Sequence, residues 1–503
     1  MLRLSLFPRL QTIRSLSLWG SLSSSLYSST ESLSGAAEPF FSSTGFDEAK
    51  VKALLTNAIR LQANSGGIAG SVYPDEALTF FVRYYKTSLA VEERPKFFSI
   101  LSEHFGIQET DVDKHVKLWG KVKGDPSTPE ARLRVLSGLA QSTQPLYASL
   151  FLPLSRLPNG LEFLVDLRGD LLELIRSKPQ HAFHLRALSN HLRDRLAEWF
   201  NVGLLRLEEL TWSRTSAELL EKVMENEVVH PISSWVDLKK RFSRDKRVFA
   251  FFHPSMPSQP LVVLHVALME KVPSKLMEIV PAEDSTHAKK GNSGKPQVGV
   301  FYSISATKPG LSGIELGNFL IKQVALRLQG VNPSVRELVT LSPLPNFRSW
   351  LLTKLTKSLE GPPEKFFTEN FRDAEFSREA LLEALTSNTF LVDDSHDTTL
   401  KPILLKLAAW YLAVEKRRNL ALDPVAHFHL KNGAWLSSVN WRSDNSTLRL
   451  SQSCGIMVNY TYKLDDVLTN NKSYLLDHKL AVEPHVYKAL DLGEDREKEL
   501  FIT

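Results

Sequence analysis

The fold is decided by the stretch VGVFYSISATKPGLSGIELGNFLIKQVALRLQG, residues Val298 to Gly330. Its first part, Val298 to Ala306, is rich in β-branched and aromatic side chains and predicts a strand. Its last part predicts an amphipathic helix that ends near Gly330. The apolar side chains of that helix fall on one stripe and are Leu316, Phe319, Leu320 and Val324. The stretch therefore predicts a strand, a glycine-rich turn and a helix in succession.

Three glycines, Gly310, Gly313 and Gly317, mark the turn. Glycine lets backbone amides approach a ligand closely, and amides at a helix start carry partial positive charge. The turn is therefore a candidate phosphate cradle. It is not a Walker loop, because no Gly-Lys-Ser/Thr closes it, and its spacing differs from the GxGxxG fingerprint of dinucleotide sites. A plain structural turn is the alternative interpretation, since strand-glycine-helix junctions are common.

Length and composition bound the class of protein. The chain has 503 residues, enough for two or three domains, and its 43% hydrophobic and 23% charged residues are ordinary for a soluble globular protein. The net charge of +5 comes from scattered Lys and Arg, so no nucleic-acid surface is expected. The single cysteine, Cys454, excludes an intrachain disulfide and any multi-cysteine metal site. No apolar run approaches the roughly 18 to 20 residues of a membrane helix.

The first segment, residues 1–34, has the composition of an organellar transit peptide. It is rich in Ser and Leu, contains Arg3, Arg9 and Arg14, and has no acidic residue before Glu31. The mitochondrial matrix is the expected destination, ahead of chloroplast, peroxisome and cytosol. A Ser-Lys-Leu peroxisomal address does not occur at the end of the sequence. A disordered tail without a targeting role is the alternative.

Residues 46–227 predict an all-α domain. Leu, Phe, Ile and Val recur there at helical spacing, and Pro, Gly and Asn separate the segments. The expected helices are Asp47–Asn64, Asp75–Leu89, Val91–Phe105, Pro129–Leu139, Gly160–Ser177 and Ala182–Phe200. The neighbouring histidines His181, His184 and His191 are interpreted as ordinary helix-surface residues, because no Cys or carboxylate pattern completes a metal site.

Strands begin near residue 230. Residues Val248–His253 and Leu261–Leu268 predict a hairpin, because two β-branched and aromatic runs flank a proline-rich turn. Residues Pro281–Gln297 have almost no apolar content and predict a loop. The later expected elements are a strand at Leu338–Pro345, a connector at Thr353–Lys365, a helical block at Phe366–Asn419, and strands at Val425–Leu430, Ala434–Trp441, Leu448–Leu450 and Gly455–Leu464. Such alternation indicates an α/β or α+β domain with a central mixed sheet.

The segment DPVAHFHLKNGA, residues Asp423 to Ala434, holds the most reactive side chains. On the strand expected there, His427 and His429 would project to the same side. A His-x-His pair can bind metal, but zinc needs a third ligand and none lies at a familiar spacing. The other interpretations are a single histidine that donates or accepts a proton, and a partly buried structural histidine.

Ser342 lies in the segment TLSPLP, Thr340 to Pro345, where two prolines stiffen the end of an expected strand. A rigid turn of this kind can aim a hydroxyl, but the pattern is not a G-x-S-x-G elbow. On this pattern alone, an ordinary turn serine is the better explanation.

Six ordered blocks together resemble the malonyl-CoA decarboxylase family. They span nearly all of Val229 to Tyr462 and read HPISSWVDLKKR, QPLVVLHVAL, FYSISATKPGLSGIELGNFLIK, TLSPLPNF, HFHLKNGAWLSSVNW and SCGIMVNYTY. The resemblance implies an α+β chain. A helical domain over residues 46–227 would serve largely for oligomerisation, as a tetramer in the family. A catalytic domain over residues 228–503 would be similar to the GNAT acetyltransferases, which hold the CoA pyrophosphate on a strand, loop and helix.

The resemblance also implies roles for individual residues. Ser342 would be the catalytic serine and His429 the catalytic histidine, while Ser303, Glu315 and Tyr462 match positions that support the site. The malonyl-CoA binding segment would comprise Ser312, Gly313, Ile314, Glu315, Leu316, Gly317 and Asn318. Two features depart from the family: the C-terminal peroxisomal signal of animal relatives is absent, and a single cysteine does not support the inter-subunit disulfides of some relatives.

The implied reaction converts malonyl-CoA to acetyl-CoA and CO2 without an organic cofactor or a metal. The carboxylate of the substrate is β to a thioester carbonyl, which can take up the electron pair as an enolate. His429 is expected to donate a proton to the α-carbon, with Ser342 bonding the carboxylate or relaying a proton. A GNAT-type acyltransferase, a non-catalytic CoA-binding scaffold and metal-assisted hydrolysis are the alternatives.

Overall fold

The computed structural model describes residues 46–64, 72–124, 129–177, 182–280, 295–314, 316–356, 377–387, 397–490 and 494–502. The transit segment expected over residues 1–34 lies outside the described residues, and so do His181, Glu315 and most of the expected loop Pro281–Gln297. The chain forms two compact units, Met1–Leu192 and Arg193–Thr503.

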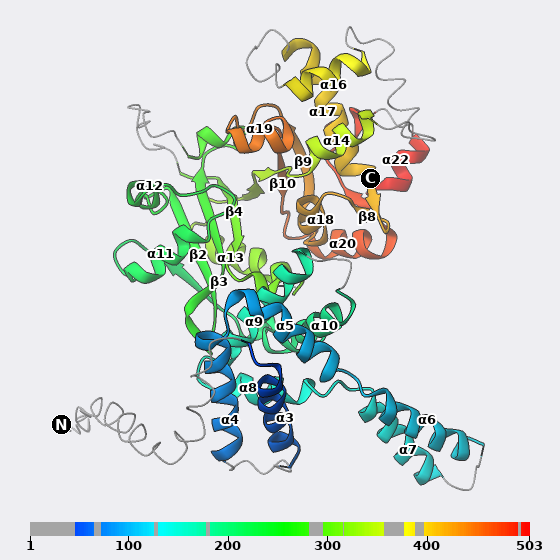
Figure 1. The fold of residues 1–503 in the computed structure, drawn as a ribbon. Helices are drawn as coiled ribbons and strands as arrows, with labels where there is room; N and C mark the ends of the chain where they lie inside the picture. The colour runs from blue at the N-terminus through cyan, green and yellow to red at the C-terminus, as the bar shows by residue number, and fades with distance from the viewer. Residues whose placement is uncertain are drawn as a thin grey trace, which may run out of the picture. The chain divides into compact units, whose positions relative to one another are not determined.

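The described part of the first unit is helical, as the spacing of apolar residues predicts (Figure 1). The helices are α3 Glu48–Asn64, α4 Val72–Arg83, α5 Arg94–Ser99, α6 Glu109–Val122, α7 Pro129–Ser142, α8 Ala148–Arg156, α9 Gly160–Ser177 and α10 Phe183–Trp199, with short π or 3-10 turns at Tyr84–Ser88, Val91–Glu93 and Ile100–His104. The boundary between the two units falls inside α10. In the core, the ring of Tyr85 lies 5.3 Å from Phe97 and 5.5 Å from Phe163, and such edge-to-face contacts stabilise an aromatic core.

The second unit is built on one mixed sheet of eight strands, ordered β1-β2-β3-β4-β5-β10-β6, with β9 paired to β10 (Figure 1). Its strands are β1 Arg206–Leu210, β2 Lys246–His253, β3 Met256–Met269, β4 Val298–Ala306, β5 Glu337–Thr340, β6 Ser342–Pro343, β9 Trp435–Asn440 and β10 Met457–Thr461. Strands β4 and β5 are parallel, while the other neighbouring pairs are antiparallel. A parallel pair requires a crossover, and helix α13, Gly317–Val331, supplies it. The predicted mixed sheet and the β2–β3 hairpin are thus confirmed.

Helices and two small sheets complete the second unit. The helices are α11 Ala217–Glu225, α12 Trp235–Lys240, α14 Phe347–Thr356, α16 Arg378–Ser387, α17 Asp397–Ala413, α18 Pro424–Lys431, α19 Thr447–Ser453, α20 Val467–Lys472, α21 Pro484–Lys488 and α22 Glu494–Leu500, with short turns at Val202–Leu204, Leu276–Glu278, Pro309–Leu311 and Ser473–Asp477. The small sheets pair β7 Lys416–Arg417 with β8 Leu420–Ala421, and β11 Leu480–Ala481 with β12 Phe501–Ile502.

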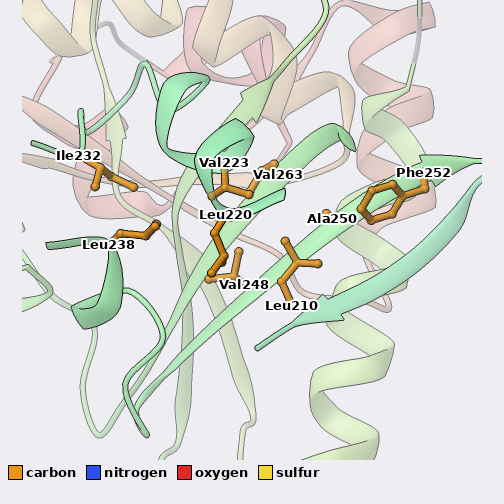
Figure 2. Close-up of a cluster of buried hydrophobic side chains, with 9 residues drawn as sticks. All are labelled: Leu210, Leu220, Val223, Ile232, Leu238, Val248, Ala250, Phe252 and Val263. Carbon is orange, nitrogen blue, oxygen red and sulfur yellow. The ribbon is translucent and has the colours of Figure 1, made fainter. Parts of the chain in front are cut away.

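An apolar cluster joins the first strands of the sheet to helix α11. Val248, Ala250 and Phe252 alternate along β2 and lie with Leu220 and Val223 of α11 in this cluster (Figure 2). The other buried members are Leu210, Ile232, Leu238 and Val263. Strand β1 and helix α11 therefore belong to the core of the sheet, although helical periodicity predicted an all-α domain up to residue 227.

A second apolar cluster packs strands β4, β5 and β10 together. It contains Tyr302 of β4, Val339 of β5 and Met457 of β10, each almost completely buried. Its other buried members are Ala267, Ile279, Val298, Val300 and Leu341. Because β4, β5 and β10 share this core, their positions relative to one another are set by packing as well as by backbone hydrogen bonds.

Several later predicted elements are also wrong. Residues Lys416–Arg417, expected near the end of the helical block Phe366–Asn419, form strand β7. Residues Val425–Leu430, expected as a strand, lie in helix α18, and residues Leu448–Leu450 lie in helix α19. Residues 353–356, expected as the start of a connector, form the last turn of α14. In α18 and α19 a capping side chain starts the helix: Asp423 accepts two backbone bonds before α18, and Ser446 accepts one before α19. Such a cap satisfies amides that a helix start leaves unpaired, and short apolar runs cannot by themselves be assigned to helix or strand.

Candidate active site

Ser342 and His429 lie far apart in the sequence but within hydrogen-bonding distance in the structure. Ser342 Oγ is 3.0 Å from His429 Nε2, and both residues are buried. Ser342 is the first residue of β6 and pairs with Val458 of β10. His429 lies in the last turn of α18. The structure thus brings together the serine and the histidine that the sequence singled out.

The imidazole of His429 contacts Ser342 and two tyrosines, Tyr460 and Tyr462. Its Nδ1 lies 2.8 Å from the hydroxyl of Tyr462, and its ring stacks on Tyr460 at 4.5 Å between centroids with an interplanar angle of 25°. Tyr460 belongs to β10, and Tyr462 follows it directly, with its backbone N–H bonded to Leu338 O at 2.8 Å. Ser342, His429 and Tyr462 therefore form a continuous hydrogen-bonded chain.

His427 points away from this chain. Residues two apart on a helix are separated by about 200° around its axis, so the two histidines of α18 do not share a face, contrary to the prediction from a strand. His427 Nδ1 instead lies 2.9 Å from the hydroxyl of Tyr474. Within the described residues, no group of three His, Cys, Asp or Glu side chains could hold a metal ion. In the same part of the chain, no helix is long and apolar enough to cross a membrane.

Burial sets which groups of this hydrogen-bonded chain are protonated. It lowers the pKa of His429 to about 3, because desolvation disfavours the charged imidazolium. It also raises the pKa of Tyr462 and of Tyr460 far above the usual value for a phenol. At neutral pH the chain therefore consists of a neutral imidazole between two protonated hydroxyls, Ser342 and Tyr462, and it carries no formal charge.

Ser303 lies in a different hydrogen-bonded group. Its hydroxyl donates to Glu227 Oε2 at 2.6 Å, and Ser305 donates to Glu227 Oε1 at 3.3 Å. Glu227 also accepts the backbone N–H groups of Val229 at 2.8 Å and His230 at 2.9 Å. The carboxylate thereby ties the start of the loop after α11 to strand β4. Sequence reasoning missed Glu227, because a lone acid before a His-Pro pair has no recognisable pattern.

Among the described residues of the glycine-rich turn, Gly313 lies in the left-handed region. Gly313 has φ +76° and is exposed, a conformation that favours glycine. A Cβ added there would meet only the Cδ of Arg193, at 4.0 Å, so the space above Gly313 is open. The amides of Ser312, Ile314 and Leu316 bond to carbonyls within the turn. The amides of these three residues are therefore paired within the turn, and Gly313 lies at an accessible surface.

Helix α13 begins directly after this turn. It starts at Gly317, and the side chains of Asn318 and Phe319 fall outside the described ones, as does Glu315 entirely. An α-helix start presents unpaired amides and partial positive charge. Helix α13 runs for 15 residues, so the turn that the sequence suggested as a phosphate cradle is followed by a regular helix.

Asp423 positions the helix that carries His429. Its Oδ1 accepts the backbone N–H groups of Val425 at 2.9 Å and Ala426 at 2.8 Å, and its Oδ2 accepts the hydroxyl of Tyr411 at 3.3 Å. The side chain is fully buried, and burial raises its pKa to about 6, although the backbone bonds and the tyrosine act in the opposite direction. A single carboxyl thus caps α18 inside the protein.

Models of two protein domains match the chain. The model of the malonyl-CoA decarboxylase C-terminal domain matches residues 203–500, and that of the malonyl-CoA decarboxylase N-terminal domain matches residues 105–200. Together they cover more than half of the sequence, including Ser342, His429 and Tyr462.

Curated proteins and solved structures give the same result. A mitochondrial malonyl-CoA decarboxylase of Anser anser anser is 37% identical over 402 residues, 78% of this chain and 79% of the relative. Its counterpart from Mus musculus is 36% identical over 405 residues, 78% of this chain and 81% of the relative. The crystal structure of malonyl-CoA decarboxylase from Rhodopseudomonas palustris superimposes with a TM-score of 0.75 at 30% identity and covers 88% of this chain and 100% of that one. The Agrobacterium vitis enzyme gives a TM-score of 0.71 at 32% identity, with the same coverage.

The cap at Asp423 generates a prediction about stability. Its folded-state pKa of about 6 lies above the ordinary value of 3.8. The stability that it contributes is therefore fully present below pH 3.8 and is lost as pH rises through about 6. Asp423→Asn keeps the capping oxygen but cannot ionise. Between pH 4 and 7 we expect the unfolding free energy of the wild type to fall relative to that of the variant, by up to about 3 kcal/mol. Calorimetric melting of both proteins across this range measures the difference, and a difference independent of pH would contradict the prediction.

Proposed function

The chain belongs to the malonyl-CoA decarboxylase family of carboxy-lyases, and from this we propose that Ser342, His429 and Tyr462 form the catalytic group that removes CO2 from malonyl-CoA. The observation that carries the proposal is the buried hydrogen-bonded chain from Ser342 through the imidazole to Tyr462. This group places a proton donor in a buried site. A carbanion that forms there needs such a donor to become protonated.

The bond changes balance with one proton taken from the protein. The bond between the α-carbon and the carboxylate carbon breaks, CO2 leaves, and the electron pair becomes an enolate of the thioester. A new C–H bond then forms at the α-carbon with a proton from His429, and the site regains a proton from solvent. The products are acetyl-CoA and CO2, and the reaction needs no redox partner.

The neutrality of His429 suits this order of events. An imidazolium beside the substrate would stabilise the carboxylate that must leave, and so would stabilise the ground state more than the transition state. Burial keeps the imidazole neutral instead, with a pKa of about 3. A neutral imidazole is still a stronger acid than the conjugate acid of a thioester enolate, so it can complete the reaction. Ser342 would bond the substrate carboxylate or accept from His429.

The CoA part of the substrate is proposed to bind at residues 312–318, with Ser303 and Glu315 supporting the site. The open surface at Gly313 and the start of α13 support this placement. The crossover from β4 through this turn to β5 also supports the proposed likeness to GNAT acetyltransferases. No cofactor or metal enters the proposal, and malonyl-CoA is its only small-molecule partner.

We further propose that the helical domain, predicted as residues 46–227, serves for oligomerisation, that strand β1 and helix α11 belong instead with residues 228–503 to the catalytic domain, and that the protein is a homo-oligomer, as a tetramer by family resemblance. Helices α6 and α7 support the first point, because neither contains a buried residue. Several of their apolar side chains, Val116, Leu133 and Leu136 among them, are exposed. A helix pair with exposed apolar residues is suited to pack against another copy.

The decisive experiment for the reaction is to incubate the purified protein with malonyl-CoA, without an acyl acceptor, and to measure acetyl-CoA and CO2. A GNAT-type acyltransferase would release no CO2 under these conditions. We expect His429→Asn to lower kcat by roughly 10²- to 10⁴-fold, because one general acid contributes about that much. Ser342→Ala should also lower kcat strongly. Unchanged turnover of folded His429→Asn would refute its role, and an effect of Ser342→Ala confined to KM would make the serine a binding residue.

Binding at the turn can be tested separately from chemistry. In Gly313→Val, a β-branched side chain must adopt φ +76° and would occupy the open space above the turn. We expect KM for malonyl-CoA to rise about tenfold or more. Gly330→Val is the matched control, because Gly330 lies near the end of the same helix α13 with open space around its Cα and no strained φ. Equal KM values for the two folded variants would show that the turn has only a structural role and does not bind malonyl-CoA.

We propose mitochondrial targeting by residues 1–34, supported by their composition and by relatives named as mitochondrial. A fluorescent fusion of the full chain should be imported into mitochondria, and a fusion that lacks residues 1–34 should stay in the cytosol. Fluorescence microscopy with a matrix marker measures the outcome. Import of the shortened fusion, or its appearance in peroxisomes, would contradict the assignment.

A further inference from the structure

The hydroxyl of Thr340 lies within hydrogen-bonding distance of Ser342. Thr340 is the last residue of β5 and is almost completely buried. Its Oγ1 accepts a hydrogen bond from Ser342 Oγ at 2.9 Å and another from the backbone N–H of Tyr460 at 3.2 Å. Its carbonyl accepts Asn459 Nδ2 at 2.8 Å. The threonine is therefore held by β10 on both its backbone and its side chain.

The hydrogen bond between the two hydroxyls has a direction. It runs from Ser342 to Thr340, and a serine hydroxyl has only one proton to donate. Ser342 Oγ is also 3.0 Å from His429 Nε2. Because the serine proton is directed at Thr340, this second contact is favourable only when Nε2 carries a proton and donates it to Ser342.

The tautomer of His429 follows from this. A neutral imidazole carries one proton, so a proton on Nε2 leaves Nδ1 as an acceptor. The hydroxyl of Tyr462, 2.8 Å from Nδ1, is then the donor. All four bonds point in one direction: Tyr462 donates to His429, His429 to Ser342, and Ser342 and the Tyr460 backbone to Thr340.

We propose that Thr340 is a positioning residue that directs the hydroxyl of Ser342 and thereby keeps His429 in the tautomer with its proton on Nε2, ready for donation. The inference rests on the proposed function of Ser342 and His429. With the opposite direction, Ser342 would donate to Nε2, and the imidazole proton would lie on Nδ1 facing Tyr462. In that state Nε2 has no proton to give to an enolate, so the chain would have to reorganise before each turnover.

The resting tautomer can be measured directly in the wild-type protein. In protein labelled with ¹⁵N histidine, the imidazole nitrogen shifts distinguish a protonated Nε2 from a protonated Nδ1, and the His429 signals are identified by their absence in His429→Asn. We expect the Nε2-protonated tautomer in the wild type. In Thr340→Val, which replaces the hydroxyl by a methyl of similar size, a population protonated on Nδ1 should appear. A wild-type imidazole protonated on Nδ1 would overturn the proposal without any variant.

Kinetics provides the second measurement. Thr340→Val removes the acceptor of both Ser342 and the backbone N–H of Tyr460. It should lower kcat about 10- to 100-fold, since losing a buried hydrogen-bond partner costs about 1 to 3 kcal/mol, with KM changed less than about twofold. Thr340→Ser keeps the hydroxyl and should restore most of the activity. The matched control is Thr461→Val. Thr461 is also a buried threonine of this sheet, and its Oγ1 accepts Ser437 Oγ at 2.6 Å, so the control also removes an acceptor. It should keep kcat near the wild-type value.

The outcomes separate this inference from the proposed function. If Ser342→Ala and His429→Asn lose activity while Thr340→Val retains it, the catalytic group stands and the role of Thr340 is refuted. If Ser342→Ala and His429→Asn both retain activity, the proposed function itself fails. If Thr340→Ser is as impaired as Thr340→Val, or the control loses as much activity, the effect belongs to packing and the inference is overturned.

Discussion

The hydrogen bonding of strand β10 to β5 and β6 is the interaction on which the candidate site depends. Through β6 it fixes Ser342 opposite Val458, and through β5 it fixes Thr340 against the backbone of Tyr460. The same strand presents the ring on which His429 stacks and leads directly to Tyr462. A strand of five residues therefore positions the polar groups of the proposed catalytic chain, because all five residues of β10 are buried and packed in the core of the sheet.

Burial is the second constraint, and it acts on protonation as well as on position. Asp423, His429 and Tyr462 are each buried, and burial shifts each pKa in the direction that favours the neutral form. It raises the pKa of Asp423 and Tyr462 and lowers that of His429. Desolvation makes hydrogen bonds stronger and unpaired polar groups more costly. In the chain from Tyr462 to Thr340, the protons of Tyr462, His429 and Ser342 each have an acceptor.

Local sequence patterns correctly predicted the elements whose conformation depends mainly on neighbouring residues. The strand β4, the turn at Gly313 and helix α13 were all predicted, because alternation, glycines and an apolar stripe are properties of neighbouring residues. The segment HFH was misassigned to a strand, although Asp423 followed by a proline is a recognised helix start. The contact between Ser342 and His429 spans 87 residues and depends on strand order, which no spacing encodes. For these two residues the resemblance to a known family supplied what pattern could not.

Strand order also explains what local reasoning missed altogether. Glu227 gains its importance from β4, where Ser303 and Ser305 face it, and Thr340 from β10. Neither has a motif of its own. The parallel pair β4–β5 links these groups, because the crossover between the two strands contains the turn and α13. A substrate held at the turn by its phosphates would thus be anchored between the strand that carries Ser303 and the one that ends at Thr340, two residues before Ser342, the proposed catalytic serine. The crossover that the topology requires is therefore also the part of the chain best placed to set the distance between substrate binding and chemistry.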